Sequence, residues 1–128
     1  MRLSAHFDSI EFACRCGCGF DTPDPALVAG LQALRNMLGR PVIVTSGCRC
    51  ARHNATVGGA RASLHVAGKA ADIRVSGMSA RELYAAARQI PQFRGFGIDD
   101  ARGFLHVDTR QLTALWSYAG NKAVSYTA

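Results

Sequence analysis

Apolar positions recur with helical spacing in two parts of the chain. In the first, the side chains of one face lie four, three and four positions apart: Leu27, Leu31, Leu34 and Leu38. Asp24-Pro25 before them is a typical helix start, and Gly39 after them is a typical stop. Ser79 and Glu82 have the S-x-x-E spacing of a capping box, which predicts a second helix that ends near Pro91.

Short apolar runs predict the strands. Residues 41–45 are a β-branched run, and residues 70–75 alternate between apolar and polar side chains. Residues 96–98 and 104–108 flank a turn, as in a hairpin. Segment 46–63, rich in Gly, Arg and Ala, has no periodicity and is expected to be a long functional loop. This order of elements predicts an α+β domain with a small antiparallel β-sheet and two main helices.

The chain has 128 residues, of which 48% are hydrophobic and 19% charged, and this indicates one compact domain over residues 1–128. Within it, residues 1–22 are expected to form an irregular, cysteine-bearing arm, and residues 117–128 a loosely held tail. No apolar stretch approaches the roughly 20 residues of a membrane-spanning helix. Residues 1–8 lack the apolar core of a signal peptide. We therefore expect neither membrane insertion nor export through a signal peptide.

The net charge is +6, from 15 Lys and Arg against 9 Asp and Glu. A surface of this charge attracts polyanions such as nucleic acid, anionic lipid or an anionic cell-wall polymer. The basic residues are scattered along the chain rather than collected in a run, which argues against a nucleic-acid tail. Charge alone does not choose among the other polyanions.

Five cysteines form two groups, with Cys14, Cys16 and Cys18 in the arm and Cys48 and Cys50 further along. An odd number cannot all pair in disulfides within one chain, and the spacing is not the C-x-x-C of common zinc modules. Free thiols, disulfides and a stapling metal ion all remain open. Alternation in an extended segment would put Cys48 and Cys50 on one side. We expect at least one arm cysteine beside one of them, joined by a disulfide or a shared metal.

Two of the four histidines lie where a metal site is conceivable. His65 and Asp72 are seven residues apart and would face one point if the chain turned at Gly68. His106, in the predicted hairpin, would add a third ligand. Two imidazoles and one carboxylate leave the fourth position of a tetrahedral zinc open for water, as in catalytic sites. On spacing alone, the alternative is that these are ordinary polar residues at strand ends.

A series of short motifs is specific as a set. They are Thr45-Ser46-Gly47-Cys48-Arg49-Cys50, His53-Asn54, Val57-Gly58-Gly59-Ala60, Ser63-Leu64-His65 with Gly68, Ala70 and Asp72, and Gly97-Ile98 with His106-Val107-Asp108. With these motifs the chain resembles the zinc peptidases of the D-alanyl-D-alanine carboxypeptidase family, which share a fold with the hedgehog signalling domain. The resemblance covers about residues 7 to 116. The Phe-x-Cys-x-Cys-Gly element of the arm is similar to that of compact members encoded by bacteriophages and prophages.

The resemblance implies the hedgehog/D,D-peptidase-like fold and one catalytic Zn²⁺. Its implied ligands are His65, Asp72 and His106. The implied reaction is hydrolysis of peptide bonds in the stem or cross-bridge of peptidoglycan. The resemblance also implies that Arg49 binds a substrate carboxylate or the developing oxyanion, tasks that suit a guanidinium fork. Ser46 and Ser63 are expected to hydrogen-bond the substrate, and a second, cysteine-bound ion is compatible with the thiols.

This chain differs from part of the family at the position of the general base. Many members carry it three residues before the last histidine ligand, where this chain has Gly103. Asp108 is available because residues two apart on a strand point to the same face, and we favour it because similar family members share the His-x-Asp pattern. Its alternative role is to orient a ligand or Arg110. Asp100 in the turn is the second candidate, since hedgehog-type relatives place an acid there. Asp99 is a third.

These features predict a zinc-dependent peptidase of bacterial peptidoglycan, an endolysin-like D,D- or L,D-type endopeptidase or carboxypeptidase. We expect a monomer, made in the cytoplasm, that reaches the cell wall through a holin or in a phage particle. Its partners would be stem or cross-bridge peptides and not nucleic acid, and the bond that is cut stays open. The alternative is a non-catalytic zinc-containing binding domain of the same fold.

Overall fold

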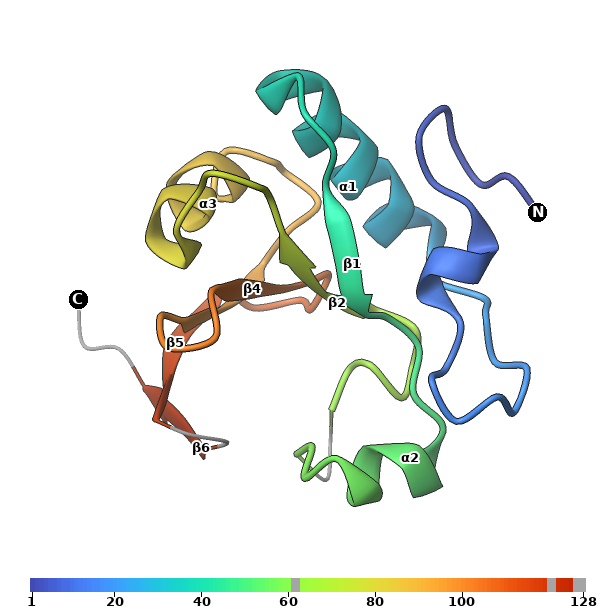
Figure 1. The fold of residues 1–128 in the computed structure, drawn as a ribbon. Coiled ribbons are helices and arrows are strands. Elements are labelled where there is room, and N and C mark those ends of the chain that lie inside the picture. The colour runs from blue at the N-terminus through green and yellow to red at the C-terminus, as the bar shows by residue number, and fades with distance from the viewer. Residues whose placement is uncertain (61–62, 120–121, 126–128) are drawn as a thin grey trace.

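The computed structural model describes residues 1–60, 63–119 and 122–125, and for 122–125 the backbone alone. Figure 1 shows the elements that these residues form. They are the 3-10 helix η1 (Ser9–Phe12), α1 (Pro25–Leu38), β1 (Ile43–Ser46), α2 (Ala51–Thr56), β2 (Ala70–Arg74), α3 (Ala80–Ala87), β3 (Gly95–Asp99), β4 (Phe104–Asp108), β5 (Ala114–Ala119) and β6 (Lys122–Ser125). None of the helices in this described part has the length and apolar character needed to cross a bilayer.

The strands of the described residues form one six-stranded sheet in the order β1-β2-β4-β3-β5-β6. Neighbouring strands are antiparallel except β3 and β5, which run parallel. The predicted α+β class is confirmed, but the sheet is larger than the small antiparallel one that we expected, and it is mixed. The additional strands, β5 and β6, extend the predicted hairpin on the side of β3.

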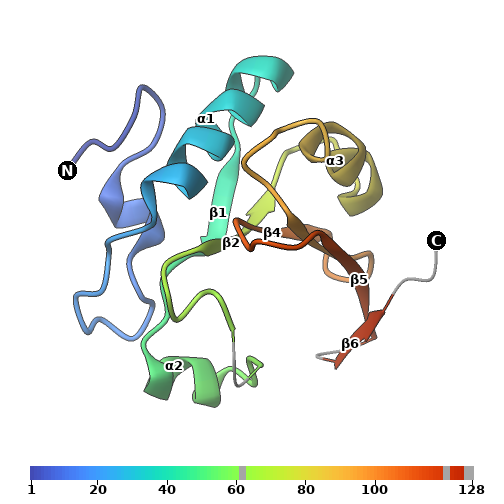
Figure 2. The same ribbon diagram turned by 180° about the vertical axis from the view of Figure 1, so that it is seen from behind.

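The sheet separates an apolar layer from a polar one. Helices α1 and α3 lie on one side of it and α2 lies on the other, as opposite views show (Figures 1 and 2). Ile73 of β2 and Leu105 and Val107 of β4 belong to the hydrophobic core. Because side chains alternate between the faces of a strand, Asp72 and His106 point to the opposite face. The residues with candidate chemistry therefore share the face that α1 and α3 leave open.

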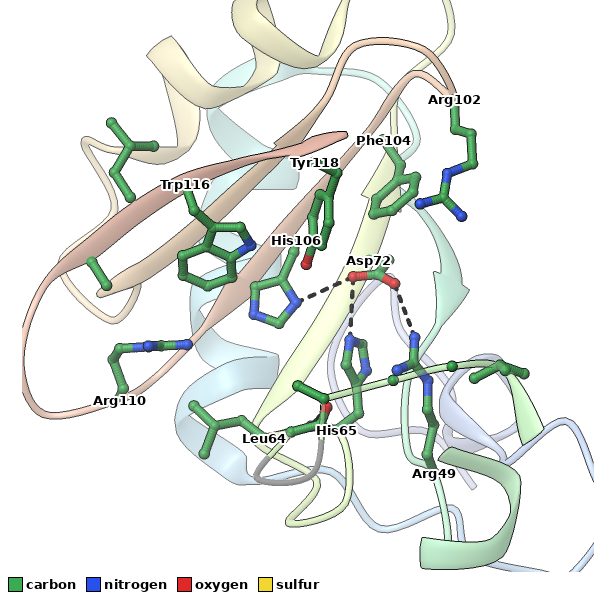
Figure 3. A pocket seen from close by; sticks show the side chains of 17 residues that line it. Arg49, Leu64, His65, Asp72, Arg102, Phe104, His106, Arg110, Trp116 and Tyr118 are labelled. Atoms are coloured by element: carbon green, nitrogen blue, oxygen red, sulfur yellow. Dashed lines mark hydrogen bonds and ion pairs between the residues drawn. The ribbon is translucent and has the colours of Figure 1, made fainter. Parts of the chain in front are cut away.

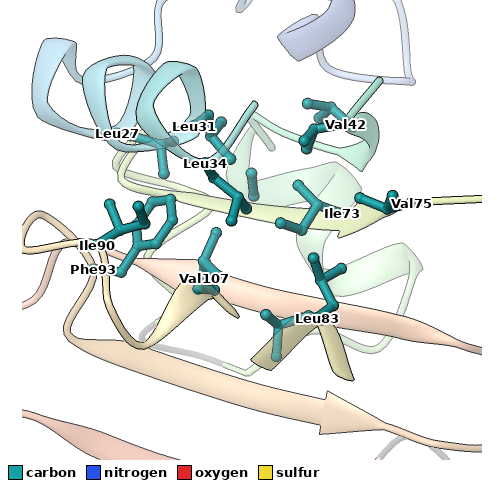
Figure 4. Packing of buried hydrophobic residues seen from close by; sticks show 14 of the residues in the cluster. Leu27, Leu31, Leu34, Val42, Ile73, Val75, Leu83, Ile90, Phe93 and Val107 are labelled. Carbon is teal, nitrogen blue, oxygen red and sulfur yellow. The ribbon is translucent and has the colours of Figure 1, made fainter. Parts of the chain in front are cut away.

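Helix α1 packs through the predicted leucine stripe. Its fully buried leucines are Leu27, Leu31 and Leu34. Figure 4 shows this stripe beside Ile73 and Val107 of the sheet. The helix begins after Asp24, whose carboxylate accepts the N–H of Ala26, and ends at Gly39, whose φ of +67° suits glycine. The start and the stop both agree with the sequence prediction.

Helix α3 also begins where the sequence predicts. The hydroxyl oxygen of Ser79 accepts the N–H of Glu82, and the Glu82 carboxylate accepts the N–H of Ser79. The helix ends at Ala87, one turn before the predicted stop at Pro91, and Ile90 beyond it is buried in the core. The apolar pattern continues past the end of the helix because the following turns pack on the same core.

Two segments are more ordered than the sequence suggests. Within the predicted loop 46–63, Ala51–Thr56 forms α2, a helix too short to produce a periodic apolar pattern. Residues 117–119 and 122–125, where we expected a loosely held tail, pair as parts of β5 and β6; the rest of segment 117–128 lies outside the described residues. β4 lies between β3 and β5 in the sequence, so no turn motif links the two paired strands and predicts their pairing.

The arm is packed into the core rather than lying loosely on the surface. Phe7 and Phe12 are 1% and 0% exposed, with ring centroids 6.1 Å apart. The N–H of Cys48 donates to the Phe12 carbonyl oxygen at 2.9 Å. A Cβ at Gly47 would lie 2.7 Å from the Phe12 Cα, so glycine permits this close approach. The arm thus docks against the segment between β1 and α2.

Candidate active site and metal centre

A pocket of about 670 Å³ opens on the polar face of the sheet. Its walls come from the loop after α2, the turn before β2, and strands β4 and β5 (Figure 3). The predicted metal ligands line it: His65, Asp72 and His106. The pocket is therefore the place where the described structure combines candidate chemistry with room for a substrate.

The three predicted ligands come together from separate parts of the chain. Asp72 of β2 lies directly opposite His106 of β4 in the antiparallel register. His65 reaches them from the turn before β2, which closes at Gly68 with a φ of +71°, as the sequence predicts. One ligand atom from each side chain lies within 4.8 Å of the others, and all three residues are buried. The Asp72 Oδ1 atom is 3.2 Å from His65 Nε2 and 3.3 Å from His106 Nδ1.

Both imidazoles are oriented by a hydrogen bond on the far side of the ring. His65 Nδ1 lies 2.7 Å from the Gly47 carbonyl oxygen, which only accepts, so this nitrogen carries the proton. His106 Nε2 lies 2.7 Å from Oδ2 of Asp108 and donates to that carboxylate. The other two ring nitrogens, His65 Nε2 and His106 Nδ1, both face Asp72, so that each can share a proton with this carboxylate or, in the neutral ring, offer its lone pair to a metal. This is how ligand histidines are held in metal sites.

Asp72 carries a negative charge in this setting. Burial raises the pKa of Asp72, but the charge of His65 and the hydrogen bonds from His106 and His65 lower it more, so the pKa lies below its ordinary range. Burial lowers the pKa of His106, whereas its bonds to Asp108 and Asp72 raise it above the usual value. The cluster thus couples an ionised carboxylate to two imidazoles, a donor set that suits a divalent metal.

Asp108 lies behind His106 and not in the pocket. It is fully buried, and it does not line the cavity. Its Oδ1 accepts from the Arg110 backbone N–H and Nε, and its Oδ2 accepts from His106 Nε2 and the Arg110 guanidinium. Burial raises the pKa of Asp108, but these donors bring it below its ordinary range. The four donors around this carboxylate favour the alternative of an orienting residue over a general base.

The other two candidate bases also lie away from the pocket. Asp100 is exposed and forms an ion pair with Arg81 of α3 at 3.0 Å. Asp99 is buried and bonds to the backbone N–H and guanidinium of Arg102. Asp100 is therefore not among the residues that line the pocket, and a base at this position stays a prediction. Among the described residues, Asp72 supplies the one carboxylate that lines the pocket.

Arg49 is held in the pocket by three partners. Its guanidinium donates to Asp72 Oδ2 at 3.3 Å, to the hydroxyl oxygen of Ser46 at 3.1 Å and to Asn54 Oδ1 at 3.2 Å. The Asn54 amide in turn donates to the carbonyl oxygen of Ala60 at 2.9 Å. The sequence places Arg49 here through the family resemblance, but the support from Asn54 on α2 depends on a helix that the sequence does not reveal.

The two candidate substrate-binding serines differ in position. Ser46 does not line the pocket, and its hydroxyl oxygen is occupied by Arg49. Ser46 therefore orients Arg49, and a contact between Ser46 and substrate stays a prediction. Ser63 does line the pocket, where its hydroxyl oxygen accepts the N–H of His65 at 3.3 Å.

Comparison with known protein families identifies this architecture. The family model described as Peptidase M15 matches residues 5–108, which include the arm, Arg49 and the buried His/Asp cluster. The chain belongs to the peptidase M15 family. No curated protein matches the chain. As a member of this family the protein is a peptidase, and its pocket is where a peptide substrate is expected to bind.

One wall of the peptidase pocket lies outside the matched residues. Trp116 and Tyr118 of β5 line the cavity together with Phe104. The Trp116 ring centroid lies 5.0 Å from that of His106, and the Cζ atom of Arg110 lies over the Trp116 ring, 4.8 Å from its centroid. Trp116 is therefore part of the pocket wall. The alternation of Trp116 and Tyr118 is the signal that would have indicated a strand.

The cysteines meet in a different combination from the expected one. Cys50 lies with the three arm cysteines, and the four sulfur atoms are within 4.8 Å of one another. Cys48 is 2% exposed and belongs to the hydrophobic core. The predicted contact between the arm and this segment is confirmed, but Cys48 and Cys50 do not share a side, because the chain turns into α2 at Cys50.

The buried position of Asp108 makes a measurable difference to stability. Asp108→Asn should lower the free energy of unfolding by about 3 kcal/mol, because it leaves the buried donors of Arg110 and His106 without their charged partner. Asp100→Asn, which breaks an exposed pair, should cost less than about 1 kcal/mol. Urea unfolding in the presence of chelator measures both without a metal contribution. Equal, small effects would contradict the buried network.

Proposed function

We propose that this M15 peptidase is zinc-dependent and hydrolyses peptide bonds of bacterial peptidoglycan, with His65, Asp72 and His106 as the metal ligands. The observation that carries the proposal is the buried cluster of two imidazoles and one carboxylate at the pocket. Three protein ligands are typical of catalytic zinc, which keeps one position for water or substrate. His65 Nδ1 and His106 Nε2 donate to the Gly47 carbonyl oxygen and the Asp108 carboxylate, which leaves the other nitrogen of each neutral ring to bind a metal.

The metal would supply the activation of water. Zinc in such a site lowers the pKa of its water to about 7 and polarises a carbonyl group. Since Asp72 is the one carboxylate among the described residues that line the pocket, no second carboxylate of those residues is placed to take the proton. The other contributions of the protein are then to position the substrate and to stabilise the charge that develops on its carbonyl oxygen.

Arg49 is the residue best placed to receive that charge. It lines the pocket beside Asp72, and its side chain is 14% exposed, so its guanidinium reaches the cavity from a fixed position. Ser46 and Asn54 hold its Nε and one of its terminal nitrogens. A preorganised donor of this kind stabilises an oxyanion without reorganisation during the reaction. The same fork suits a substrate carboxylate.

Tyr118 is a second donor at the pocket. Figure 3 shows its hydroxyl pointing toward His106 and Asp72. Burial raises the pKa of Tyr118 above its ordinary value, so the phenol keeps its proton at neutral pH and donates. We assign to it a hydrogen bond to the substrate carbonyl oxygen as negative charge develops there.

The charges around the pocket favour an anionic substrate. Arg102 and Arg110 line the cavity in addition to Arg49, and the whole chain carries a net charge of +6. Peptidoglycan stem and cross-bridge peptides carry free carboxylates, and the wall is anionic. An endolysin-like role, as a D,D- or L,D-type endopeptidase or carboxypeptidase that reaches the wall from a phage particle or through a holin, is the form of the proposal that we favour.

A specific observation favours a second candidate function. Because Asp72 is the one carboxylate that the described residues bring to the pocket, the chain also suits a non-catalytic, zinc-containing domain that binds wall peptides. The two functions differ in whether sacculi are cut or only bound.

Digestion of purified sacculi tests the main proposal. The protein should release soluble fragments, chelator should abolish the release, and added zinc should restore it. His65→Ala should stay inactive with zinc, whereas His53→Ala, outside the pocket, should keep its activity. Release that persists in chelator would contradict zinc dependence, and sedimentation with sacculi without any release would favour the binding domain.

Arg49→Lys tests the role of the guanidinium. The variant keeps the charge but loses the fork, so peptide hydrolysis should fall by roughly 100-fold. Arg52→Lys, on the exposed side of α2, is the matched control and should leave the rate unchanged. Steady-state kinetics on a stem-peptide substrate measures both. Equal rates for the two variants would assign Arg49 a purely structural role.

Tyr118→Phe removes the hydroxyl and keeps the ring. The value of kcat should fall by roughly 10- to 100-fold with little change in KM, because the lost hydrogen bond is made in the transition state. Tyr84→Phe on α3, where the ring packs on Phe96, is the control. A rise in KM at constant kcat would instead make Tyr118 a residue of ground-state binding.

A further inference from the structure

Four cysteines of the arm and of α2 form a cluster that the peptidase chemistry does not use. Cys14 and Cys16 Sγ atoms lie 3.5 Å apart, Cys16 and Cys50 Sγ atoms lie 3.6 Å apart, and Cys18 completes a set whose members are all within 4.8 Å of one another. The loop of the arm lies beside the segment that leads into α2 in both views (Figures 1 and 2). We propose that these four thiolates hold one Zn²⁺ in a structural site separate from the pocket.

The spacing of the sulfur atoms fits this ion. Tetrahedral zinc with bonds of about 2.3 Å to sulfur requires sulfur atoms about 3.8 Å apart, close to the separations of 3.5 Å between Cys14 and Cys16 and 3.6 Å between Cys16 and Cys50. A disulfide needs a sulfur–sulfur distance of about 2.05 Å, and all of these cysteines are unbridged. Four thiolates close the coordination sphere, which is typical of structural rather than catalytic zinc.

The backbone of the arm is shaped to wrap such an ion. Gly17 and Gly19 have φ values of +80° and +92°, and a Cβ on either would meet no atom within 4 Å. Glycine is therefore required there by the backbone conformation and not by lack of space. The N–H of Cys14 donates to the Phe20 carbonyl oxygen at 2.8 Å and so closes the loop that carries three of the thiols.

Backbone donors already point at the sulfur atoms. The N–H of Cys50 donates to Cys14 Sγ, and the N–H of His53 donates to Cys50 Sγ, each at 3.4 Å. Such bonds orient ligands and stabilise thiolates around a metal. Cys16 and Cys18 are exposed, so hydrophobic packing does not explain why they lie beside the other two.

The site would tie the arm to the catalytic pocket. Cys50 directly follows Arg49, whose backbone N–H donates to the His65 carbonyl oxygen at 3.0 Å. A metal that fixes Cys50 to the arm fixes the start of α2, and with it Asn54, which holds the Arg49 guanidinium. The ion would thus act at a distance from the substrate, by keeping Arg49 in place.

Metal counting separates this site from the peptidase centre. The full chain, purified under reducing conditions with zinc, should hold two ions. Cys16→Ser/Cys18→Ser should lose one ion, and so should His65→Ala; all three substitutions together should lose both. Cys48→Ala is the matched control, because Cys48 lies in the core outside the cluster, and it should lose none.

Cobalt substitution identifies the ligands directly. The thiolate-to-cobalt charge-transfer absorption should be present in the wild-type chain and in His65→Ala, and absent from Cys16→Ser/Cys18→Ser. A double-serine variant with the wild-type zinc content and cobalt spectrum would overturn the proposal, as would disulfides among these four cysteines in the reduced, zinc-supplied protein. Loss of an ion in the serine variant but not in His65→Ala would support this site while contradicting the zinc centre of the proposed function.

Discussion

The pairing of β2 with β4 is the constraint on which the site depends. The register sets Asp72 opposite His106, and alternation along both strands turns these side chains away from the core that Ile73, Leu105 and Val107 form with the helices. A shift of one residue would send the carboxylate and the imidazole into the apolar layer. The burial of the core residues and the assembly of the metal-type cluster are therefore consequences of the same register.

Around this pair of strands, several side chains orient the pocket residues His106 and Arg49 without lining the pocket as reactive groups. Asp108 is ionised and buried, a position that is stable only because Arg110 and His106 donate to both of its oxygens. Gly95 on the neighbouring strand leaves the space for it, since a Cβ there would collide with the carboxylate. Arg49 is held in a similar way by Ser46 and Asn54. In both cases hydrogen bonds hold a charged group, the Asp108 carboxylate or the Arg49 guanidinium, in one position although the group is largely buried.

The arm and the C-terminal strands extend the site beyond the central sheet. The arm docks through Phe7 and Phe12 and brings three thiols to Cys50, next to Arg49. On the other side, β5 pairs with β3 and presents Trp116 and Tyr118 to the pocket. The strand β5 therefore forms part of the cavity wall, while the arm contacts only the segment next to Arg49.

The sequence by itself determined the features that depend on local physics. The leucine stripe and caps of α1, the capping box of α3 and the hairpin of β3 and β4 follow from periodicity and from turn and cap residues a few positions apart. The turn at Gly68 belongs with them. The motif order, through the family resemblance, also indicated that His65, Asp72 and His106 would come together.

Only the tertiary structure decided how distant groups meet. Asp108 shares a strand face with His106, as alternation predicts, but whether its carboxylate faces the cavity or Arg110 depends on side chains of other segments. Asp100 forms an ion pair with Arg81 of α3 and lies outside the pocket lining. Cys50, and not Cys48, lies with the arm cysteines, because the chain turns at the start of α2. The parallel pairing of β5 with β3 joins residues without a local turn, so the alternation of Trp116 and Tyr118 could indicate a strand but not its place in the wall of the pocket.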